Sequence, residues 1–475
     1  MPQLQFPSRF IARITIEFLT PFHSGSGTEG DVADAAVVLD VNGLPAIPGT
    51  TLAGILRHAF EQPSTMATAK ALFGFQERGH VHKSNGQGSR LSFSWASIHD
   101  ATNTPVYGYH PSLPSDDMVL ARAQSPTLRD HVRITHRGVA AQHGKFDELC
   151  IAAGNRFTFE MELVGSNDDN ETWNQLLHLW HHPALRIGAK TRRGFGAFKV
   201  VQILSASFDL TTKEGFSQYT TLPRSLAEPA PSLTPFKNGN NHASLPNTYA
   251  TIVLRLEPRS YWMFGGGEDP EGTDMAPVTD FRIIWHNNSA AIQDDLIYIP
   301  GSALKGALAH RVCFHANKYL ENFADKVSDL DAVTGSNNPV VRELFGFMKG
   351  NANSKEGARG RIIINDTFLK PRNDFQRQIV HHVSIDRFTG GARAGALFNE
   401  HPLYRHPDGG FDLTIYIENP AALSPIAKKA LRDTLNDLCE ARLPIGGGTG
   451  RGLGFCNGSI IQGMDIFNVE NSNAH

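Results

Sequence analysis

The chain has 475 residues, of which 40% are hydrophobic and 19% are charged, and it is long enough for two or three domains with substantial cores. Its net charge of −3 argues against indiscriminate binding of polyanions but is compatible with a narrow basic groove. No apolar run is long enough to cross a bilayer, the N-terminus has no signal-peptide pattern, and the four cysteines form no CxxC pair. We therefore expect a cytoplasmic protein that has no membrane partner, disulfide framework or zinc finger.

The first half of the chain begins with a half-buried strand over residues 11–18, where polar and apolar side chains alternate. A glycine-bearing loop follows, with Asp31 and Asp34 at its far end, before the strand-like run 35–39. An Ile-Pro-Gly turn at 47–49 then opens a helix, and we expect Thr50 to cap it. Beyond it, the pattern predicts strands over 90–95, 156–164 and 197–203, a helix over 173–182 and irregular structure over 107–130.

The first half ends in a glycine-rich segment, residues 188–196, and is followed by a region rich in proline, serine, threonine and asparagine. This region, residues 209–247, is predicted to be a linker or a surface strap. The sequence therefore divides into a first domain, 1–208, the linker, 209–247, and a second domain, 248–475.

The second half repeats the landmarks of the first in the same order. A second Ile-Pro-Gly turn stands at 299–301, again before a hydroxyl residue, Ser302, and a second glycine-rich segment stands at 446–454. Matching landmarks are 251 to 258 residues apart, which indicates a tandem duplication. Each half reads as strand, helix, strand, strand, helix, strand, so we expect an α+β fold with two tandem ferredoxin-like domains.

These segments together resemble the RAMP superfamily of CRISPR-associated proteins, and within it the Cas-seven backbone subunits of type III effector complexes. The resemblance rests on the glycine loop, the Ile-Pro-Gly-hydroxyl-x-Leu turn and a Leu-Phe-Gly helix end. It also rests on the segment 383–398, with its Ile-Asp-Arg-Phe-Thr-Gly core, and on the Gly-x-Gly-Arg-Gly-x-Gly tail. It covers both halves and leaves only the linker out, and two fused units are similar to the tandem subunits of type III-D variants.

The resemblance implies an RRM-type palm with an inserted thumb hairpin in each unit. It further implies a subunit that binds a guide RNA (crRNA), assembles with other effector subunits and cleaves complementary single-stranded target RNA with Mg²⁺ or Mn²⁺. In the family, an aspartate in the loop before the Ile-Pro-Gly turn drives this endonuclease reaction. By that pattern, Asp34 is the candidate in the first unit, with Asp31 as a rival, and Asp280 and Asp274 compete in the second. Asp34 and Asp280 are the candidate metal ligands.

Cations and one aromatic residue near the glycine tails and in the thumb loops are the candidates for RNA contact. Glycine amides and neighbouring cations suit phosphate, and an aromatic ring suits stacking on unpaired bases. The candidate residues are His23, Arg57, Arg133, Arg137, Lys190, Arg192, Arg193, Lys305, Arg387, Phe388, Arg393 and Arg451.

Two other functions remain open from the sequence. The chain could be the same guide-binding scaffold with one or both aspartate sites silent. It could also be a stand-alone RAMP ribonuclease that processes guide precursors by histidine acid–base chemistry, although no such histidine pattern stands out in the sequence.

Overall fold

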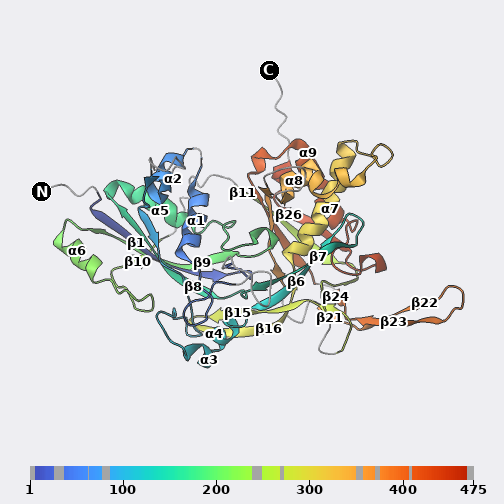
Figure 1. Ribbon diagram of the computed structural model, residues 1–475, viewed down its shortest axis with the longest axis horizontal. Helices are drawn as coiled ribbons and strands as arrows, with labels where there is room; N and C mark the ends of the chain where they lie inside the picture. Colours follow the sequence, from blue (N-terminus) through green and yellow to red (C-terminus); the bar gives the residue numbers. More distant parts are fainter. Residues whose placement is uncertain are drawn as a thin grey trace, which may run out of the picture.

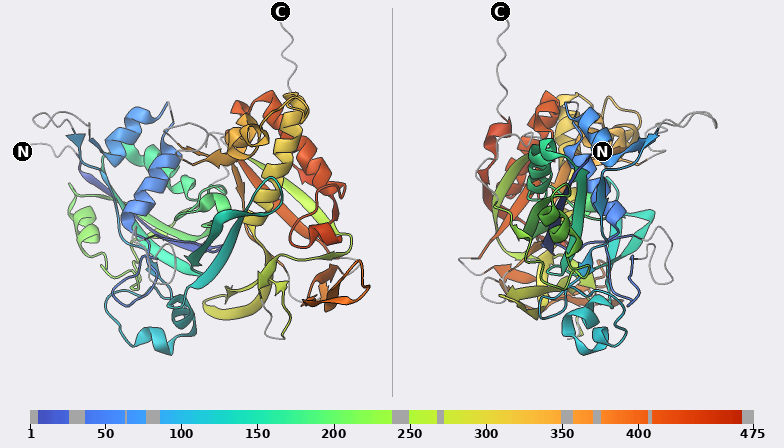
Figure 2. Two further views of the ribbon diagram at one scale, coloured as in Figure 1. Left: turned by 45° about the vertical axis from the view of Figure 1, so that its right-hand side comes forward. Right: turned by 90° about the vertical axis from the view of Figure 1, so that its left-hand side faces the viewer.

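The computed structural model describes residues 6–25, 37–62, 64–76, 86–237, 249–267, 272–348, 357–369, 375–405 and 409–467. Two α+β units lie side by side, each with an antiparallel sheet and helices packed on one of its faces (Figures 1 and 2). Each unit has its own large hydrophobic core, one formed by residues between 10 and 203 and the other by residues between 252 and 467.

The first sheet is built on β1 (Ser8–Phe18), which pairs with β8 (Arg156–Gly165) on one side and β9 (Phe198–Asp209) on the other. The short strand β4 (Leu91–Phe93) continues the sheet beyond β8, so the fourth, first, third and second strands of the core lie in that order. Leucines of three helices pack on this sheet, and these helices are α1 (Gly49–Phe60), α2 (Met66–Phe73) and α5 (Asn170–Leu179).

The second sheet has the same order of strands along the chain. Its central strand β11 (Tyr249–Pro258) lies between β25 (Phe411–Glu418) and β26 (Cys456–Gln462), and β19 (Ile362–Ile364) lies beyond β25. The helices that pack on it are α7 (Gly301–Tyr319), α8 (Pro339–Phe345) and α9 (Pro425–Cys439). Both halves thus repeat one arrangement, as the sequence repeat predicts.

A long hairpin is inserted between the second and third core strands of each unit. In the first unit it is formed by β6 (Thr127–Ile134) and β7 (Ala140–Cys150), and in the second by β22 (Val380–Ile385) and β23 (Ala392–Glu400). The predicted irregular segment 107–130 is corrected here, because it contains α3 (Leu113–Asp116), α4 (Met118–Ala123) and the start of β6. Its short elements lack the sustained period by which sequence patterns are recognised.

The second unit also carries a hairpin of β15 (Thr279–His286) and β16 (Ser289–Ile299) before its Ile-Pro-Gly turn. In the first unit, the corresponding segment is a shorter turn, bridged between Leu39 and Pro45. Short strands complete the fold: β2 (Phe75–Gln76), β3 (Gly86–Gln87), β5 (Ser97–Ile98), β12 (Tyr261–Trp262), β13 (Gly265–Gly267), β14 (Ala276–Pro277), β17 (Gly346–Phe347), β18 (Ala358–Arg359), β20 (Thr367–Phe368), β21 (Phe375–Arg377) and β24 (Leu403–Arg405).

The helices α1 and α7 begin at the glycines of the two Ile-Pro-Gly turns, as expected, but the expected side-chain caps are absent. Thr50 and Ser302 lie inside the first turns of the helices, and the N-cap residues are prolines without a side-chain cap. In α7 the amide of Gly301 instead donates to Oδ1 of Asp366, 2.8 Å away. The cap is therefore supplied from a residue distant in sequence, which local spacing cannot reveal.

Part of the predicted linker packs as a strap over the first unit. Helix α6 (Lys213–Thr220) follows β9, and β10 (Thr234–Pro235) pairs with β9 at the edge of the sheet. Ala230 and Leu233 are buried with Ile11 in a small separate cluster. Of the two structures predicted for this region, a linker and a surface strap, residues 210–237 therefore form the surface strap.

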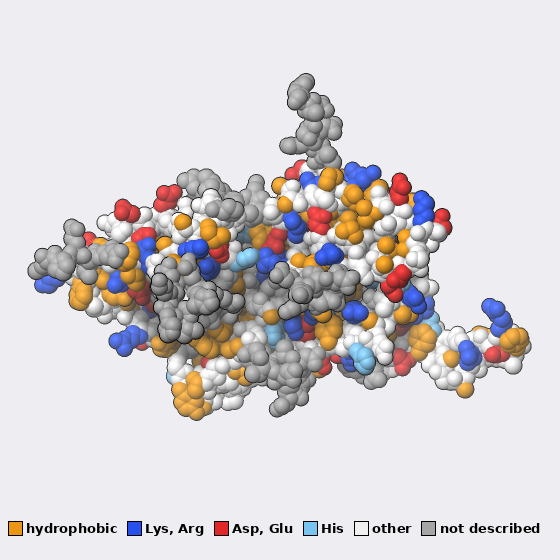
Figure 3. Space-filling model, turned by 45° about the horizontal axis from the view of Figure 1, so that its top comes forward, with side chains coloured by type: hydrophobic (Ala, Val, Ile, Leu, Met, Phe, Trp, Pro, Cys, Tyr) orange, Lys and Arg blue, Asp and Glu red, His pale blue; other side chains and the backbone are white. Residues whose placement is uncertain are grey.

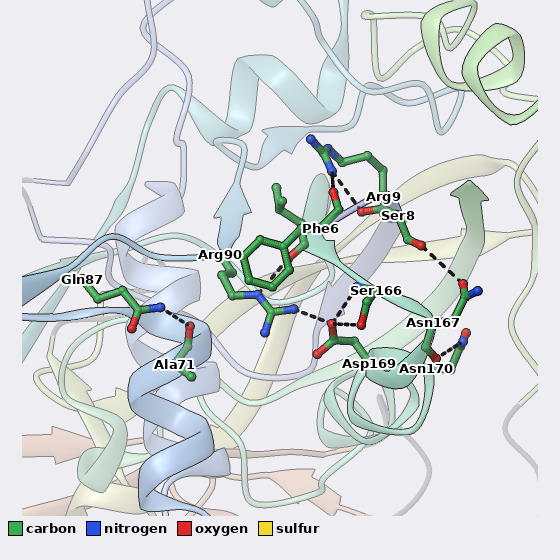
Figure 4. Close-up of polar contacts among 11 residues, drawn as sticks. Phe6, Ser8, Arg9, Ala71, Gln87, Arg90, Ser166, Asn167, Asp169 and Asn170 are labelled. Carbon is green, nitrogen blue, oxygen red and sulfur yellow. Dashed lines mark hydrogen bonds and ion pairs between the residues drawn. The ribbon is translucent and has the colours of Figure 1, made fainter. Parts of the chain in front are cut away.

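Arg90 ties the edge of the first sheet to the start of α5 (Figure 4). Its guanidinium donates to the carbonyl of Val164 at 2.9 Å and to Asp169, which also accepts from the amide of Ser166 at 2.8 Å. The backbone amide of Arg90 donates to Leu72, and in the second unit the amide of Arg361 donates in the same way to Leu344. The two units thus share individual backbone contacts, and residue-by-residue equivalence can be read from them.

Candidate nucleic-acid interface

The base of the first hairpin holds a buried carboxylate, Glu148, whose side chain is 1% exposed. Lys190 lies 2.9 Å from its Oε1, and Arg193 forms an ion pair with the same oxygen. His131 stacks on Phe146 across the hairpin, and the guanidinium carbon of Arg193 lies 4.7 Å from the centre of that ring. Glu148 therefore joins the hairpin base to the first glycine-rich turn.

The second hairpin carries the same cluster at the same register. Glu400, also 1% exposed, accepts from His382 at 2.9 Å and from Arg451 at 2.6 Å. His382 stacks on Phe398, and Arg451 lies 5.4 Å from the centre of that ring. In the backbone register of the hairpins, Arg129 is opposite Glu148 and Val380 is opposite Glu400, so the two clusters occupy equivalent positions.

Sequence reasoning missed these two carboxylates and both histidines. The signal was present, since His131 and Glu148 recur 251 and 252 residues later as His382 and Glu400. Their partners on the glycine-rich turns are more than 40 residues away along the chain, so the cluster emerges only in the fold.

The two glycine-rich turns have matching backbones. Thr191–Arg193 and Thr449–Arg451 each form one turn of 3₁₀ helix, preceded by a residue with positive φ (Lys190 at 60° and Gly448 at 68°). At the start of each turn a glycine packs on the backbone of the first-strand loop: an added Cβ on Gly188 would lie 2.4 Å from the carbonyl of His23. Close packing of this kind requires glycine there, independently of any ligand.

All the cations predicted to lie free beside the glycine tails are in fact paired with carboxylates. Lys190 and Arg193 share Glu148, Arg451 binds Glu400, and Arg192 binds Glu418 of the second unit. The sequence offers these cations as partners for phosphate, and in the structure each already has a carboxylate partner.

One cation of this region keeps its charge unpaired. Lys305, half-buried on the first turns of α7, has no ion pair or hydrogen bond to any residue that the structure describes. Burial and the nearby charges of Arg192 and Arg193 lower its pKa to about 8. Beside it, Nε and Nη1 of Arg192 are buried without a hydrogen-bond partner among the described residues. Donors of both units therefore meet at this point with no acceptor for them.

The joint between the units contains a buried ionic cluster, beside an apolar one in which Val119 packs with Ile283 and Ala290. Arg129 of the first hairpin is buried, lies 2.7 Å from Asp280 and also pairs with Asp366. Its guanidinium carbon lies 4.3 Å from the centre of the Tyr298 ring, and nearby Arg186 donates to Asn365 at 2.8 Å. A buried set of charges of this kind fixes the geometry of the contact between the units, because removal of one partner leaves the others buried without a counter-charge.

This joint corrects the assignment of Asp280 as a catalytic and metal-binding residue. Its side chain is 1% exposed and is committed to Arg129, so it cannot approach a phosphate. The backbone register also excludes Asp280 as the equivalent of Asp34. The amide of Val278 donates to the carbonyl of Phe264, as the amide of Val38 donates to that of Ser24, so Asp280 is equivalent to Asp40. By the same count, Asp274 is the residue that matches Asp34 in sequence.

Asp274 is exposed and is held at the base of the second hairpin. Its Oδ2 accepts from the amide of Asn399 at 2.7 Å, and its own amide donates to the Asn399 side chain. Its Oδ1 has no partner among the described residues. The carboxylate is therefore able to serve as one ligand of a cation whose coordination shell is completed by phosphate oxygens. The described ranges contain no group of three or more His, Cys, Asp or Glu arranged to hold a metal ion. Asp34 and Asp31 lie outside the described residues.

A family model identifies the chain. The model of the RAMP superfamily matches residues 15–199 and 255–457, which together span both units. The chain belongs to the RAMP superfamily. No curated protein matches it. A chain of a type III-B Cmr-β complex bound to cognate target RNA aligns with 42% of this chain and with 61% of its own length, at 16% identity and a TM-score of 0.29.

Two further RNA-binding candidates have internal roles in the first RAMP unit. His23 is buried, and its Nδ1 lies 2.7 Å from the carbonyl of Leu149 at the end of the hairpin, which indicates a structural side chain. Arg57 on α1 pairs with Glu61 at 3.6 Å and donates to the carbonyl of Gly74 at 3.2 Å.

No helix in the described part of the chain is both long and apolar enough to span a membrane.

Each of the two hairpins carries exposed cations. Arg133 and Arg137 are exposed on the first hairpin, whose His136 lies 3.2 Å from Asp331 of the second unit. The second hairpin projects from the molecule (Figure 1) and carries both charged and hydrophobic side chains (Figure 3). Near its tip are Arg387, Arg393 and Phe388, whose side chain is 96% exposed.

Proposed function

We propose that the chain is a Cas-seven-type backbone subunit of a type III CRISPR effector complex, and that it binds the guide RNA across its two RAMP units. The proposal draws on family membership, on the resemblance of the five repeated segments, and on two sheets whose shared strand order is that of a ferredoxin-like palm. Other effector subunits and the target RNA are the expected partners.

The observation that carries the proposal is the unsatisfied cationic site at the joint. A half-buried ammonium without an acceptor is costly unless an anion binds it, and the charge of the neighbouring Arg192 adds to the attraction for that anion. A backbone phosphate of RNA has the charge and the acceptor oxygens to pair with Lys305. Exposed cations also lie on both hairpins, and Phe388 offers a ring for an unpaired base.

RNA binding tests this proposal directly. Lys305→Ala should weaken binding of single-stranded RNA by about tenfold at low salt and reduce the salt slope by about one, since one phosphate contact is lost. Lys213→Ala, on the remote helix α6, removes the same charge and should have no such effect. A wild-type chain that binds no RNA, or equal effects of the two variants, would contradict the proposal.

We also propose that Asp34 and Asp274 support metal-dependent cleavage of target RNA, one in each unit. A carboxylate that holds Mg²⁺ or Mn²⁺ beside a phosphate can neutralise developing charge and orient the attacking 2′-hydroxyl. With guide, target and Mg²⁺ present, Asp34→Ala and Asp274→Ala should each abolish one cleavage position, while Asp31→Ala should abolish none. RNA binding should survive each change.

The alternatives give different cleavage patterns. An intact ladder in both aspartate variants would identify the chain as a scaffold. Cleavage that persists in EDTA and is lost in His382→Ala would favour the acid–base ribonuclease instead.

A further inference from the structure

The two buried glutamates at the hairpin bases face arginines that are themselves half open to solvent. Glu148 and Glu400 are each 1% exposed, whereas the side chains of Arg193 and Arg451 are 39% and 41% exposed. Each guanidinium therefore presents one edge to the protein carboxylate and leaves donors free on the other side.

The charges of the two clusters differ by one. In the first, Lys190 and Arg193 face one carboxylate, so one positive charge remains, and burial lowers the pKa of the adjacent His131, which is then neutral near pH 7. In the second, Gly448 occupies the place of Lys190, so Glu400 pairs with one arginine, Arg451, and with His382. The second turn is thus neutralised by its own carboxylate.

We propose that Glu148 and Glu400 are internal counter-anions that compete with RNA phosphates for Arg193 and Arg451. This inference rests on the proposed function of the turns as phosphate-binding elements. A phosphate that approaches an arginine already paired with a buried carboxylate gains less than it would from an uncompensated cation, because the carboxylate repels it through the same low-dielectric site. The glutamates thereby lower RNA affinity while holding the hairpin against the turn.

The test compares charge removal at this site with charge removal elsewhere, in the full-length chain. Glu400→Gln keeps the shape of the side chain and one of its two acceptor oxygens, and it removes the charge that neutralises Arg451. The matched control is Asp412→Asn, which removes an exposed carboxylate that pairs with Arg255, 3.2 Å away on the second sheet. Fluorescence anisotropy with labelled single-stranded RNA, measured over a salt series, gives both affinity and salt slope.

Glu400→Gln should bind RNA about threefold to tenfold more tightly at low salt, with a salt slope steeper by about one, and Asp412→Asn should match the wild type. Glu148→Gln should show a smaller gain, because the first turn already has a surplus charge. A purely structural glutamate would instead give weaker or unchanged binding, and that result with a folded variant would overturn the inference.

The design separates the two proposals. If the wild type binds RNA and neither glutamine variant binds more tightly, the counter-anion role fails while the proposed function stands. If no variant binds RNA at any salt concentration, the proposed function fails and this inference fails with it. Thermal unfolding checks each variant, and Glu148→Gln decides alone if Glu400→Gln does not fold.

Discussion

The two hairpins have the same register and base cluster, but only the first is used as an internal joint. In the first, Arg129 inserts between Asp280 and Asp366, and His136 reaches Asp331 of the second unit. In the second, Val380 occupies the position of Arg129, and the hairpin projects from the molecule (Figure 1). Two hairpins of one register therefore differ at this position, where the docked hairpin has Arg129 and the projecting hairpin has Val380.

The two units also differ at the surface that, in the second unit, contacts the first hairpin. Backbone equivalence places Trp95, 54% exposed, where the second unit has buried Asp366, and places Val164 where it has Glu418. On the turns, Gly450 stands where the first unit has Arg192. Arg192, Asp366 and Glu418 thus have no ionic counterpart at the equivalent positions of the other unit, although both sheets keep one strand order.

The largest expected effect comes from breaking the joint. Arg129→Ala leaves Asp280 and Asp366 buried without their counter-charge, and it should lower the free energy of unfolding by about 3–5 kcal/mol. Val380→Ala, at the matching position of the free hairpin, should cost under about 1 kcal/mol. Denaturant unfolding measures both, and equal losses would show that the two hairpins are not used differently.

The free hairpin should matter for RNA rather than for stability. Phe388→Ala removes a ring that is 96% exposed, so it should leave unfolding unchanged but weaken RNA binding by about 1–3 kcal/mol, the contribution of one stacked base. Phe216→Ala, which removes another exposed ring on α6, is the control for nonspecific contact. Unchanged binding by Phe388→Ala would exclude stacking at this tip.

Protonation of Lys305 should make RNA binding depend on pH. Because burial and two neighbouring arginines lower its pKa to about 8, the ammonium group loses its proton as the pH rises from 7 to 9. Wild-type affinity should fall over that window by up to about tenfold, and Lys305→Arg should abolish the fall, since arginine stays charged. The same pH profile in both proteins would rule out Lys305 as the titrating contact.

The smallest expected effect is a gain in the first unit. Ala53 occupies the position that Lys305 has in the second unit, five residues after each Ile-Pro-Gly proline. Ala53→Lys should therefore strengthen RNA binding by about threefold or less, through one added phosphate contact. Binding assays at several salt concentrations detect the change, and a loss of affinity would show that the two units do not approach RNA alike.

Most of the fold follows from local sequence signals. Alternation predicted β1 and β8, and the Ile-Pro-Gly turns marked the starts of α1 and α7. The helix cap from Asp366 and the short helices α3 and α4 were missed, because the first depends on a contact across the fold and the second on segments too short for a period.

The candidate site was predicted less completely. The sequence located the glycine turns and Lys305, but it could not show that Glu148, Glu400 and Glu418 neutralise the neighbouring arginines. Asp280 was misassigned because an acidic residue before an apolar run looks the same whether the fold buries it or exposes it. In the structure, burial against Arg129 and the backbone register both distinguish it from Asp274.

The central claim is that one RNA path crosses the joint between the two units and continues onto the free hairpin. Ultraviolet crosslinking of bound single-stranded RNA, followed by mass spectrometry of the peptides, tests it most directly. The account predicts crosslinks in the peptide that contains Lys305 and in the one that contains Phe388, with the first lost in Lys305→Ala. Crosslinks confined to the strap or to α9, with neither of these peptides labelled, would contradict it.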